Sequence, residues 1–317
     1  MILILMLLLL QSTFFEMCKA RPFVKIQKQE MGNLEEVFVH LGAWFNICDF
    51  AYIPHGDAWA PGVSNFQPSN PENIPAGSLV FVTPYGIERF LSEVHPTIKN
   101  PYILVTLYYG PVCAVKEYVN DPKIIAWFGQ ANRDAITYEK FTLIPLGVFR
   151  DETVFQRRGQ FNEIFKQYRQ SQKPKPLYMN FVIHEGRGGE TEYRRAVYDI
   201  FKHKPFCTVG TPKPFANYID ETAQCKFVVS PTGDMVDCYR HWEALVVGSI
   251  PIVHRSPLDA AFEDLPVVIV DDYKDVTQEF LNRKYEEIQH KTYNLRKLYM
   301  QYWVDKINAA RTNFLKS

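Results

Sequence analysis

Residues 225–253, CKFVVSPTGDMVDCYRHWEALVVGSIPIV, contain the pattern that decides the fold of this chain. An apolar, β-branched run at 226–230 predicts a short buried strand that ends in a turn containing Pro and Gly. Residues 238–247 have helical spacing, Gly248 stands at the expected C-terminal cap, and residues 250–253 predict a second buried strand. This order predicts a parallel βαβ unit, in which the loop and the helix N-terminus form a ready anion site.

The composition predicts a globular protein and excludes a generic nucleic-acid binder. The 317 residues are 47% apolar and 22% charged, enough for one large domain or two of ordinary size. The 35 basic and 35 acidic residues balance, so no electrostatic footprint for nucleic acid is present. The six cysteines lack zinc-ligand spacing and no Asp-x-Asp occurs, so we expect neither a metal nor another cofactor.

The first twenty residues predict a targeting segment. Residues 1–10 are an unbroken apolar run, which is shorter than the roughly 20 residues of a membrane helix. Small residues before Arg21 fit signal-peptide cleavage, so we expect export or a secretory-pathway lumen, which is the ER or Golgi in a eukaryote. No basic residue precedes the run and Glu16 lies near the cleavage position, so a signal-anchor with membrane association and a non-targeting N-terminus remain alternatives.

Predicted strands and helices alternate on both sides of a polar, Pro-containing linker at 171–176. This alternation predicts an α/β fold with mainly parallel sheets. We divide the chain into the segment 1–20, an N-terminal α/β domain at 21–172, and a C-terminal domain at 173–317 that ends in helices. Two such halves would face each other across a cleft, a favoured place for a ligand. The predicted strands cover 78–83, 102–107, 124–128, 141–144, 177–183, 207–209, 226–230, 250–253 and 265–270.

Two charged residues interrupt the apolar helix of the βαβ unit. Arg240 and Glu243 are three residues apart and share a helix face, so they could simply pair with each other. Alternatively, Arg240 binds a diphosphate and Glu243 accepts hydrogen bonds from two ribose hydroxyls, since these are the groups that a guanidinium and a carboxylate recognise. Gly233 would then allow close approach of the ligand to the backbone.

Residues 226–270 resemble the nucleotide-sugar-binding half of exostosin-like glycosyltransferases (GT47 type). That family has Ser/Cys-Pro-x-Gly, then a helix with Arg and Glu-Ala, then Gly-x-x-Pro-Val/Ile, as this chain does. Residues 99–106, 125–130 and 144–147 resemble the same group with less specificity. One departure is Thr232, where many relatives carry Arg.

The resemblance implies a GT-B-like fold, with two Rossmann-like domains facing a cleft and C-terminal helices. Residues 21–172 would form the acceptor side, and residues 173–317 would bind the nucleotide sugar. The implied reaction moves a hexosyl or pentosyl group from a nucleotide-diphosphate donor, preferably a UDP-sugar, to a hydroxyl of a glycan or glycoconjugate. It is expected to be inverting and independent of a metal, with the nucleotide sugar as co-substrate.

The candidate donor-binding residues follow from the same segment. Arg240 and the backbone N–H groups at the helix start would stabilise the charge on the leaving diphosphate. The loop HEGRGG at 184–189 fits a phosphate-binding turn and fits a flexible surface loop equally well. The candidates for nucleotide-sugar binding are His184, Arg187, Ser230, Thr232, Gly233, Asp237, Arg240 and Glu243.

An inverting transfer also needs a general base, which we expect from the first half of the chain. His55 and Asp57, in a loop after an aromatic strand, are the preferred candidates, and Glu88 and Glu185 are weaker ones. Two alternative functions remain: a GDP-fucose-dependent fucosyltransferase, and a non-catalytic carbohydrate-binding relative. Stabilisation by UDP, by GDP or by neither nucleotide would separate the three.

Overall fold

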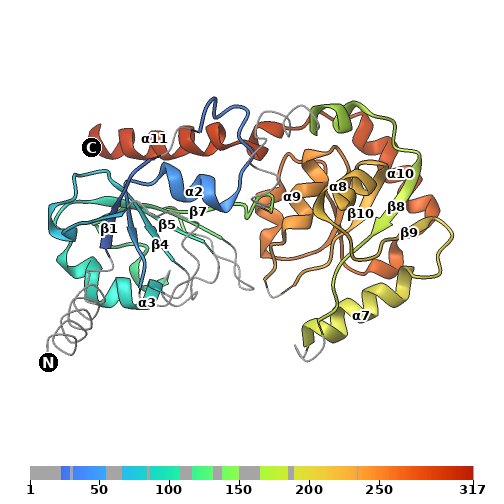
Figure 1. Cartoon of the computed structure of the whole chain (residues 1–317), viewed down its shortest axis with the longest axis horizontal. Helices are drawn as coiled ribbons and strands as arrows, with labels where there is room; N and C mark the ends of the chain where they lie inside the picture. The colour runs from blue at the N-terminus through green and yellow to red at the C-terminus, as the bar shows by residue number, and fades with distance from the viewer. Residues whose placement is uncertain are drawn as a thin grey trace, which may run out of the picture.

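The computed structural model describes residues 23–28, 31–54, 66–83, 86–107, 116–130, 138–149, 165–184, 189–233 and 235–316. These residues form two α/β lobes, each built around one sheet, which lie side by side in Figure 1. Within them, no helix is long and apolar enough to cross a membrane. The expected targeting segment at 1–20 lies outside the described residues.

The sheet of the first lobe has seven strands in the order β3-β1-β2-β4-β5-β6-β7. Neighbouring strands pair in parallel from β2 through β4, β5 and β6 to β7. Strand β1 is antiparallel to its two neighbours, β2 and β3. The sequence predicted β4 to β7 but not β1 and β3, which have only four and three residues and form through pairing with distant segments. Their bounds are β1 Phe23–Ile26, β2 Phe50–Tyr52, β3 Phe66–Pro68, β4 Leu79–Val82, β5 Tyr102–Thr106, β6 Ile124–Gly129 and β7 Phe141–Leu143.

The helices of the first lobe are short. Helix α2 covers Leu41–Ile47, and α3 covers Ile87–Arg89 and continues as a π-helical turn at Phe90–Val94. Single 3₁₀ turns occupy Pro71–Asn73 and His95–Thr97.

The sheet of the second lobe is entirely parallel, with the order β12-β11-β10-β8-β9. Read from β9 to β12, and with the five strands numbered along the chain, this is the doubly wound order 2-1-3-4-5. In such sheets the ligand crevice lies where the strand order reverses, which is here between β8 and β10. The strands are β8 Lys175–Met179, β9 Cys207–Val209, β10 Cys225–Val229, β11 Ile250–His254 and β12 Val268–Val270. The helices are α7 Gly189–Phe201, α8 Phe215–Ala223, α9 Tyr239–Val246 and α10 Gln278–Gln289, with 3₁₀ turns at Pro257–Phe262, Tyr273–Asp275 and Leu295–Leu298.

The βαβ unit predicted from residues 225–253 is confirmed as β10, α9 and β11. Phe227 pairs with Ile250 in a parallel register. Gly248 has a φ of 77°, a left-handed conformation that favours glycine at a helix C-terminus. A Cβ at this position would also lie 3.0 Å from the backbone of Arg169. Conformation and space therefore both require glycine here.

The polar linker at 171–176 is tied to the second lobe. Lys173 Nζ donates hydrogen bonds to Ala223 O at 2.7 Å and to Val247 O at 2.9 Å. Both carbonyls lie at helix C-terminal ends, where a cation is favourable. Burial lowers the pKa of Lys173 to about 8. The linker thus caps α8 and α9 before the chain enters β8.

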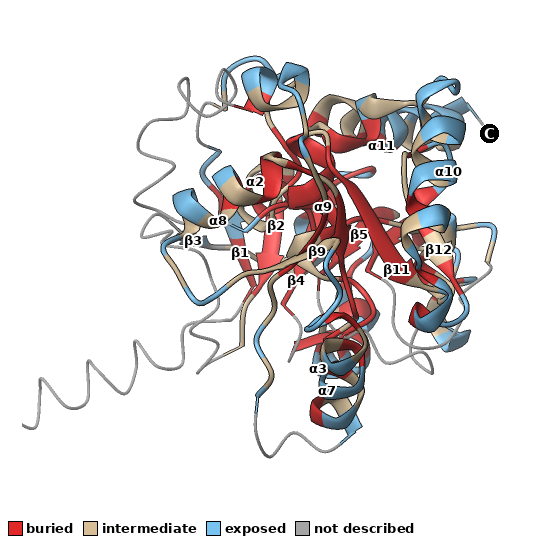
Figure 2. Cartoon of the chain, turned by 90° about the vertical axis from the view of Figure 1, so that its right-hand side faces the viewer, coloured by how far each residue is buried: buried red, intermediate tan, exposed pale blue. Residues whose placement is uncertain are grey.

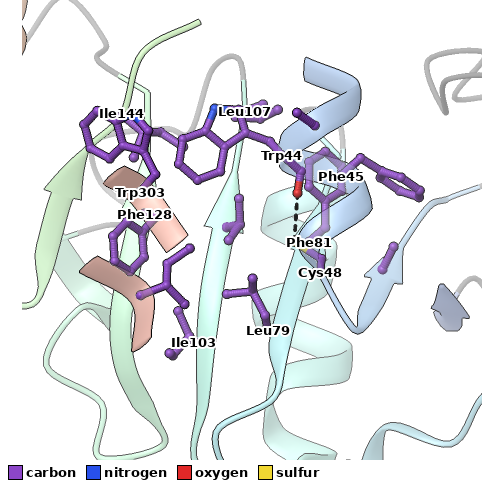
Figure 3. Packing of buried hydrophobic residues seen from close by; sticks show 14 of the residues in the cluster. Trp44, Phe45, Cys48, Leu79, Phe81, Ile103, Leu107, Phe128, Ile144 and Trp303 are labelled. Atoms are coloured by element: carbon purple, nitrogen blue, oxygen red, sulfur yellow. Dashed lines mark hydrogen bonds between the residues drawn. The ribbon is translucent and has the colours of Figure 1, made fainter. Parts of the chain in front are cut away.

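Each sheet is buried on both faces, as the red strands in Figure 2 show. Figure 3 shows one face of the first sheet, where Phe81 and Phe128 pack with Trp44 of α2 and with Trp303. Trp303 belongs to the last helix, α11 (Met300–Lys316), and its ring lies 5.8 Å from that of Trp44. The chain therefore returns to the first lobe at its end.

The position of α11 differs from our grouping of residues 173–317 as one unit. Its buried residues Met300, Trp303 and Ile307 form one stripe that covers the first sheet. Helical periodicity identifies such a stripe but does not say which sheet it covers, because burial of apolar surface is not directional.

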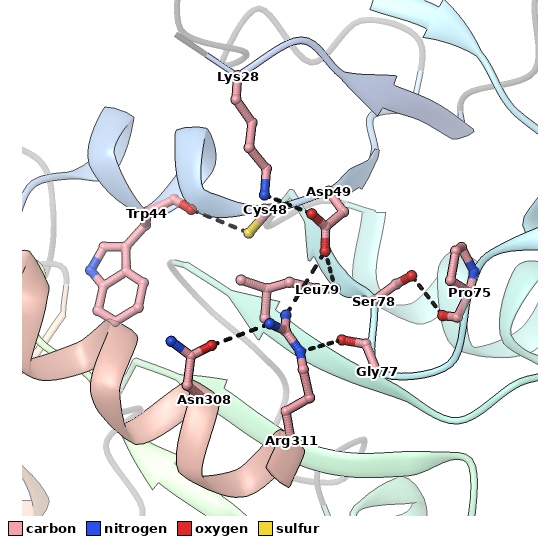
Figure 4. Close-up of polar contacts among 10 residues, drawn as sticks. All are labelled: Lys28, Trp44, Cys48, Asp49, Pro75, Gly77, Ser78, Leu79, Asn308 and Arg311. Atoms are coloured by element: carbon pink, nitrogen blue, oxygen red, sulfur yellow. Dashed lines mark hydrogen bonds and ion pairs between the residues drawn. The ribbon is translucent and has the colours of Figure 1, made fainter. Parts of the chain in front are cut away.

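Charged residues fasten α11 at the N-terminal ends of β2 and β4 (Figure 4). Arg311 Nε donates to Gly77 O at 2.9 Å, and its Nη2 lies 4.0 Å from Asp49 Oδ2. The Asp49 carboxylate also accepts from the Leu79 N–H at 2.9 Å and pairs with Lys28 at 2.7 Å. We call Lys28, Asp49 and Arg311 the latch.

Candidate active site

A cavity of about 470 Å³ lies where the strand order of the second sheet reverses. Asn180 and Phe181 line it after β8, and Gly233 lines it after β10. Leu146 and Phe149, on the segment that follows β7, also line it. A larger cavity of about 790 Å³ lies beside the latch, where Lys28, Asp49 and Arg311 already bond one another. The position at the switch point favours the smaller cavity as the functional site.

Arg240 joins the ends of β8 and β10 across this cavity. Its Nε donates to Asn180 O at 3.1 Å and its Nη1 donates to Pro231 O at 3.1 Å. The guanidinium lies 5.3 Å from the centre of the Phe181 ring. Among the described residues, no ion pair joins Arg240 to Glu243, so the interpretation that these two residues pair with each other is wrong.

A second guanidinium, that of Arg194 on α7, lies at the same place. Its Nε donates to Thr232 O at 2.9 Å, its Nη1 donates to Val182 O at 2.7 Å, and Glu190 lies 3.5 Å away. Burial first, and then the nearby charge of Arg240, lower the pKa of Arg194. Two guanidiniums this close repel each other, and an anion bound between them would relieve the repulsion.

Gly233 is explained by Arg194. A Cβ at position 233 would collide with the Arg194 guanidinium, so only glycine leaves room for this cation. The sequence analysis missed Arg194, because on α7 it is followed by the similar Arg195, and periodicity alone does not show which of them is buried. Arg194 thus brings a cation from α7 to the carbonyl of Thr232.

Glu243 is buried and binds both lobes. Its Oε1 accepts the Phe149 N–H at 3.2 Å, and its Oε2 accepts the Tyr218 hydroxyl at 3.0 Å. A carboxylate offers about four acceptor positions, so it can accept further hydrogen bonds from a ligand. Burial raises the pKa of Glu243 to about 7.

Asp237 is a second buried carboxyl that connects the lobes. It accepts the Leu146 N–H at 2.7 Å and the Trp242 Nε1–H at 2.6 Å. Burial raises its pKa to about 7 against the opposing effect of these donors. It lines the cavity, but the bonds given above direct both of its oxygens into the protein.

Ser230 and Thr232 do not line the cavity. Ser230 is fully buried, and its hydroxyl lies 2.7 Å from His241 Nδ1. Burial lowers the pKa of His241 to about 3, so the ring is neutral and donates from Nε2 to Val236 O at 3.2 Å. Ser230 and His241 therefore form an internal pair under the loop after β10.

The structure brings most of the predicted donor-binding residues together. Gly233, Asp237, Arg240 and Glu243 line the cavity, with the exposed His184 at its edge. Glu88 is exposed on α3 and is not among the lining residues. Four predicted residues lie outside the described ones: His55, Asp57, Glu185 and Arg187.

Besides Arg194, the sequence analysis missed Asn180, Tyr218 and Phe149 of the cavity lining. Asn180 was hidden because it lies inside the strand predicted at 177–183, whereas the observed β8 ends at Met179 and leaves Asn180 at the switch point. Tyr218 and Phe149 had no local signal, since they reach Glu243 from a different helix and from the other lobe.

Comparison with known proteins supports a glycosyltransferase family. A family model described as the RXYLT1 C-terminal domain matches residues 197–316, a range that contains Arg240 and Glu243 but is less than half of the chain. No curated protein matches the sequence.

Two solved structures are similar in part. An α1,3-fucosyltransferase shares 16% identity with a TM-score of 0.39, over 77% of this chain and 79% of that one. A glycosyltransferase of kitacinnamycin shares 11% identity with a TM-score of 0.32, over 76% of this chain and 72% of that one. Both TM-scores are too low to carry an argument about this chain.

Proposed function

We propose that this chain is a GT-B-type glycosyltransferase that moves a sugar from a nucleotide-diphosphate donor, preferably a UDP-sugar, to a hydroxyl of a glycan acceptor. The observation that carries the proposal is the cavity at the switch point of the second sheet, where Arg194 and Arg240 stand beside Glu243. The family match over residues 197–316 supports the same class of reaction.

The proposed chemistry follows from the two cations. When the sugar leaves, negative charge develops on the nucleoside diphosphate, and fixed positive groups lower the barrier by stabilising it. Arg194 and Arg240 are held in place by backbone carbonyls, so little reorganisation is needed when that charge appears. We propose an inverting, metal-independent transfer in which the guanidiniums supply the charge compensation.

The rest of the proposal assigns parts of the chain to the reaction. Residues 173–299 would hold the donor, and the first lobe would supply the acceptor side and the general base, for which His55 and Asp57 remain the predictions. Transfer to glycans in a secretory-pathway lumen, with residues 1–20 as the targeting or anchoring segment, is part of the same proposal.

Nucleotide-induced thermal stabilisation tests this function. UDP is expected to raise the melting temperature of the wild type more than GDP does, and Arg240→Ala should abolish the rise. A larger shift with GDP would favour a fucosyltransferase. No shift with either nucleotide, together with intact glycan binding, would contradict the proposal and favour a carbohydrate-binding protein. A hydrolysis screen over nucleotide sugars then identifies the donor.

A further inference from the structure

Exposed apolar side chains gather at the candidate active site. Among the described residues, three large apolar side chains are strongly exposed: Phe149 at 46%, Val182 at 54% and Leu315 at 63%. Phe149 and Val182 both line the cavity, whereas Leu315 lies near the end of α11. Exposed apolar side chains that line the same cavity are a feature of ligand-binding grooves.

Phe149 is held firmly although its ring is exposed. The ring packs edge-to-face on Tyr239, with 5.2 Å between centroids, and also contacts Phe215 at 6.2 Å. Its backbone N–H donates to Glu243. A ring fixed in this way offers a flat surface without the entropic cost of ordering a mobile side chain.

The polar and aromatic groups that line the cavity follow one another from the strand ends to Phe149. Arg194 and Arg240 stand at the ends of β8 and β10, Glu243 lies about one turn further along α9, and Phe149 is bonded to Glu243. Cation, hydrogen-bond acceptor and aromatic ring match the phosphates, the ribose and the base of a nucleotide, in that sequence.

We propose that Phe149 is the surface on which the base of the donor nucleotide stacks. This inference rests on the proposed function and adds the direction in which the donor lies: diphosphate at Arg194 and Arg240, ribose at Glu243, base at Phe149. Phe149 lies on the segment that follows β7, and its ring packs on Phe215 and Tyr239 of the second lobe, so the base would be held where the chain leaves the first lobe. Stacking tolerates any base, so Phe149 adds affinity for UDP and GDP alike.

The test compares dissociation constants of UDP and of inorganic pyrophosphate, measured by calorimetry on the full chain. Phe149→Ala should weaken UDP binding about 5- to 100-fold, the range expected for one stacked base, and leave pyrophosphate binding unchanged. Phe149→Leu keeps apolar packing on Tyr239 but lacks the flat face, so it should lose UDP affinity while melting like the wild type. Leu315→Ala is the matched control and should change neither constant.

Each other outcome overturns the inference in a distinguishable way. UDP binding within twofold of the wild type in both Phe149 variants rules out stacking, and a raised acceptor KM in those variants would assign the ring to the acceptor sugar instead. Equal weakening of UDP and pyrophosphate would mean that Phe149 only supports the loop. A wild type that binds neither UDP nor GDP overturns the proposed function together with this inference.

Discussion

The latch and the candidate active site both gather charged residues, but they satisfy them differently. In the latch, Asp49 pairs with Lys28 at 2.7 Å and also lies 4.0 Å from Arg311, so both cations share one carboxylate. At the cavity, Arg240 bonds only carbonyls in the contacts described above, whereas Arg194 bonds two carbonyls and forms an ion pair with Glu190 at 3.5 Å. Carbonyls orient a guanidinium without cancelling its charge. Both cations of the latch therefore face a carboxylate, whereas Arg240 is oriented by carbonyls alone and keeps its charge for an anion.

The largest expected effect is on the cations of the cavity. Arg240→Ala should lower turnover of the donor about 100- to 1000-fold, the usual loss when one preorganised donor to a developing charge is removed. Steady-state kinetics with the donor found by the screen measure it. Arg195→Ala, an exposed arginine on α7, is the control and should retain activity. Turnover of Arg240→Ala within threefold of the wild type would contradict the assignment of charge stabilisation to this residue.

The buried carboxyl of Asp237 should make stability depend on pH. Its folded-state pKa is about 7, above the ordinary value of about 4 in the unfolded chain, so it adds stability fully only below pH 4 and loses it as pH rises through 7. The loss is on the order of a few kcal/mol. Denaturant unfolding of the wild type and of Asp237→Asn should therefore show a wild-type advantage that shrinks between about pH 4 and 7. A constant difference would mean that the N–H donors keep the carboxylate ionised throughout.

A smaller effect is expected from Gly233→Ala, which tests how Arg194 is seated. The added methyl group collides with the Arg194 guanidinium, so this cation must move away from the Thr232 carbonyl. We expect about tenfold weaker binding of inorganic pyrophosphate, consistent with the loss of one charge-assisted hydrogen bond. Calorimetric titration measures it. Unchanged affinity would show that Arg194 does not contribute to anion binding.

The smallest effect is expected in the latch. Arg311→Ala removes one hydrogen bond to Gly77 and a partly exposed charge contact, which together are worth about 1 kcal/mol of unfolding free energy. UDP affinity should stay as in the wild type, because the latch lies at the N-terminal ends of β2 and β4 in the first sheet and the cavity lies at the ends of β8 and β10 in the second. A loss of UDP binding in Arg311→Ala would show that the two regions are coupled.

Much of the second lobe could be predicted from local patterns. The strands β8 to β12 and helix α9 were expected within a few residues, because buried strands and amphipathic helices leave periodic signals in the sequence. The strands β1 and β3 carried too few residues for such a signal. Of the site, Gly233, Arg240 and Glu243 were found because they break the apolar pattern of a single βαβ unit.

The sequence by itself determined the βαβ unit at 225–253, including Gly248 at the end of its helix, because strand, helix and cap depend on residues close together in the chain. Only the tertiary structure decided that α11 covers the first sheet, that Arg194 reaches the Thr232 carbonyl, and that Phe149 meets Glu243. These contacts join distant segments through burial and backbone hydrogen bonds, which are not specific to one partner until the chain is folded.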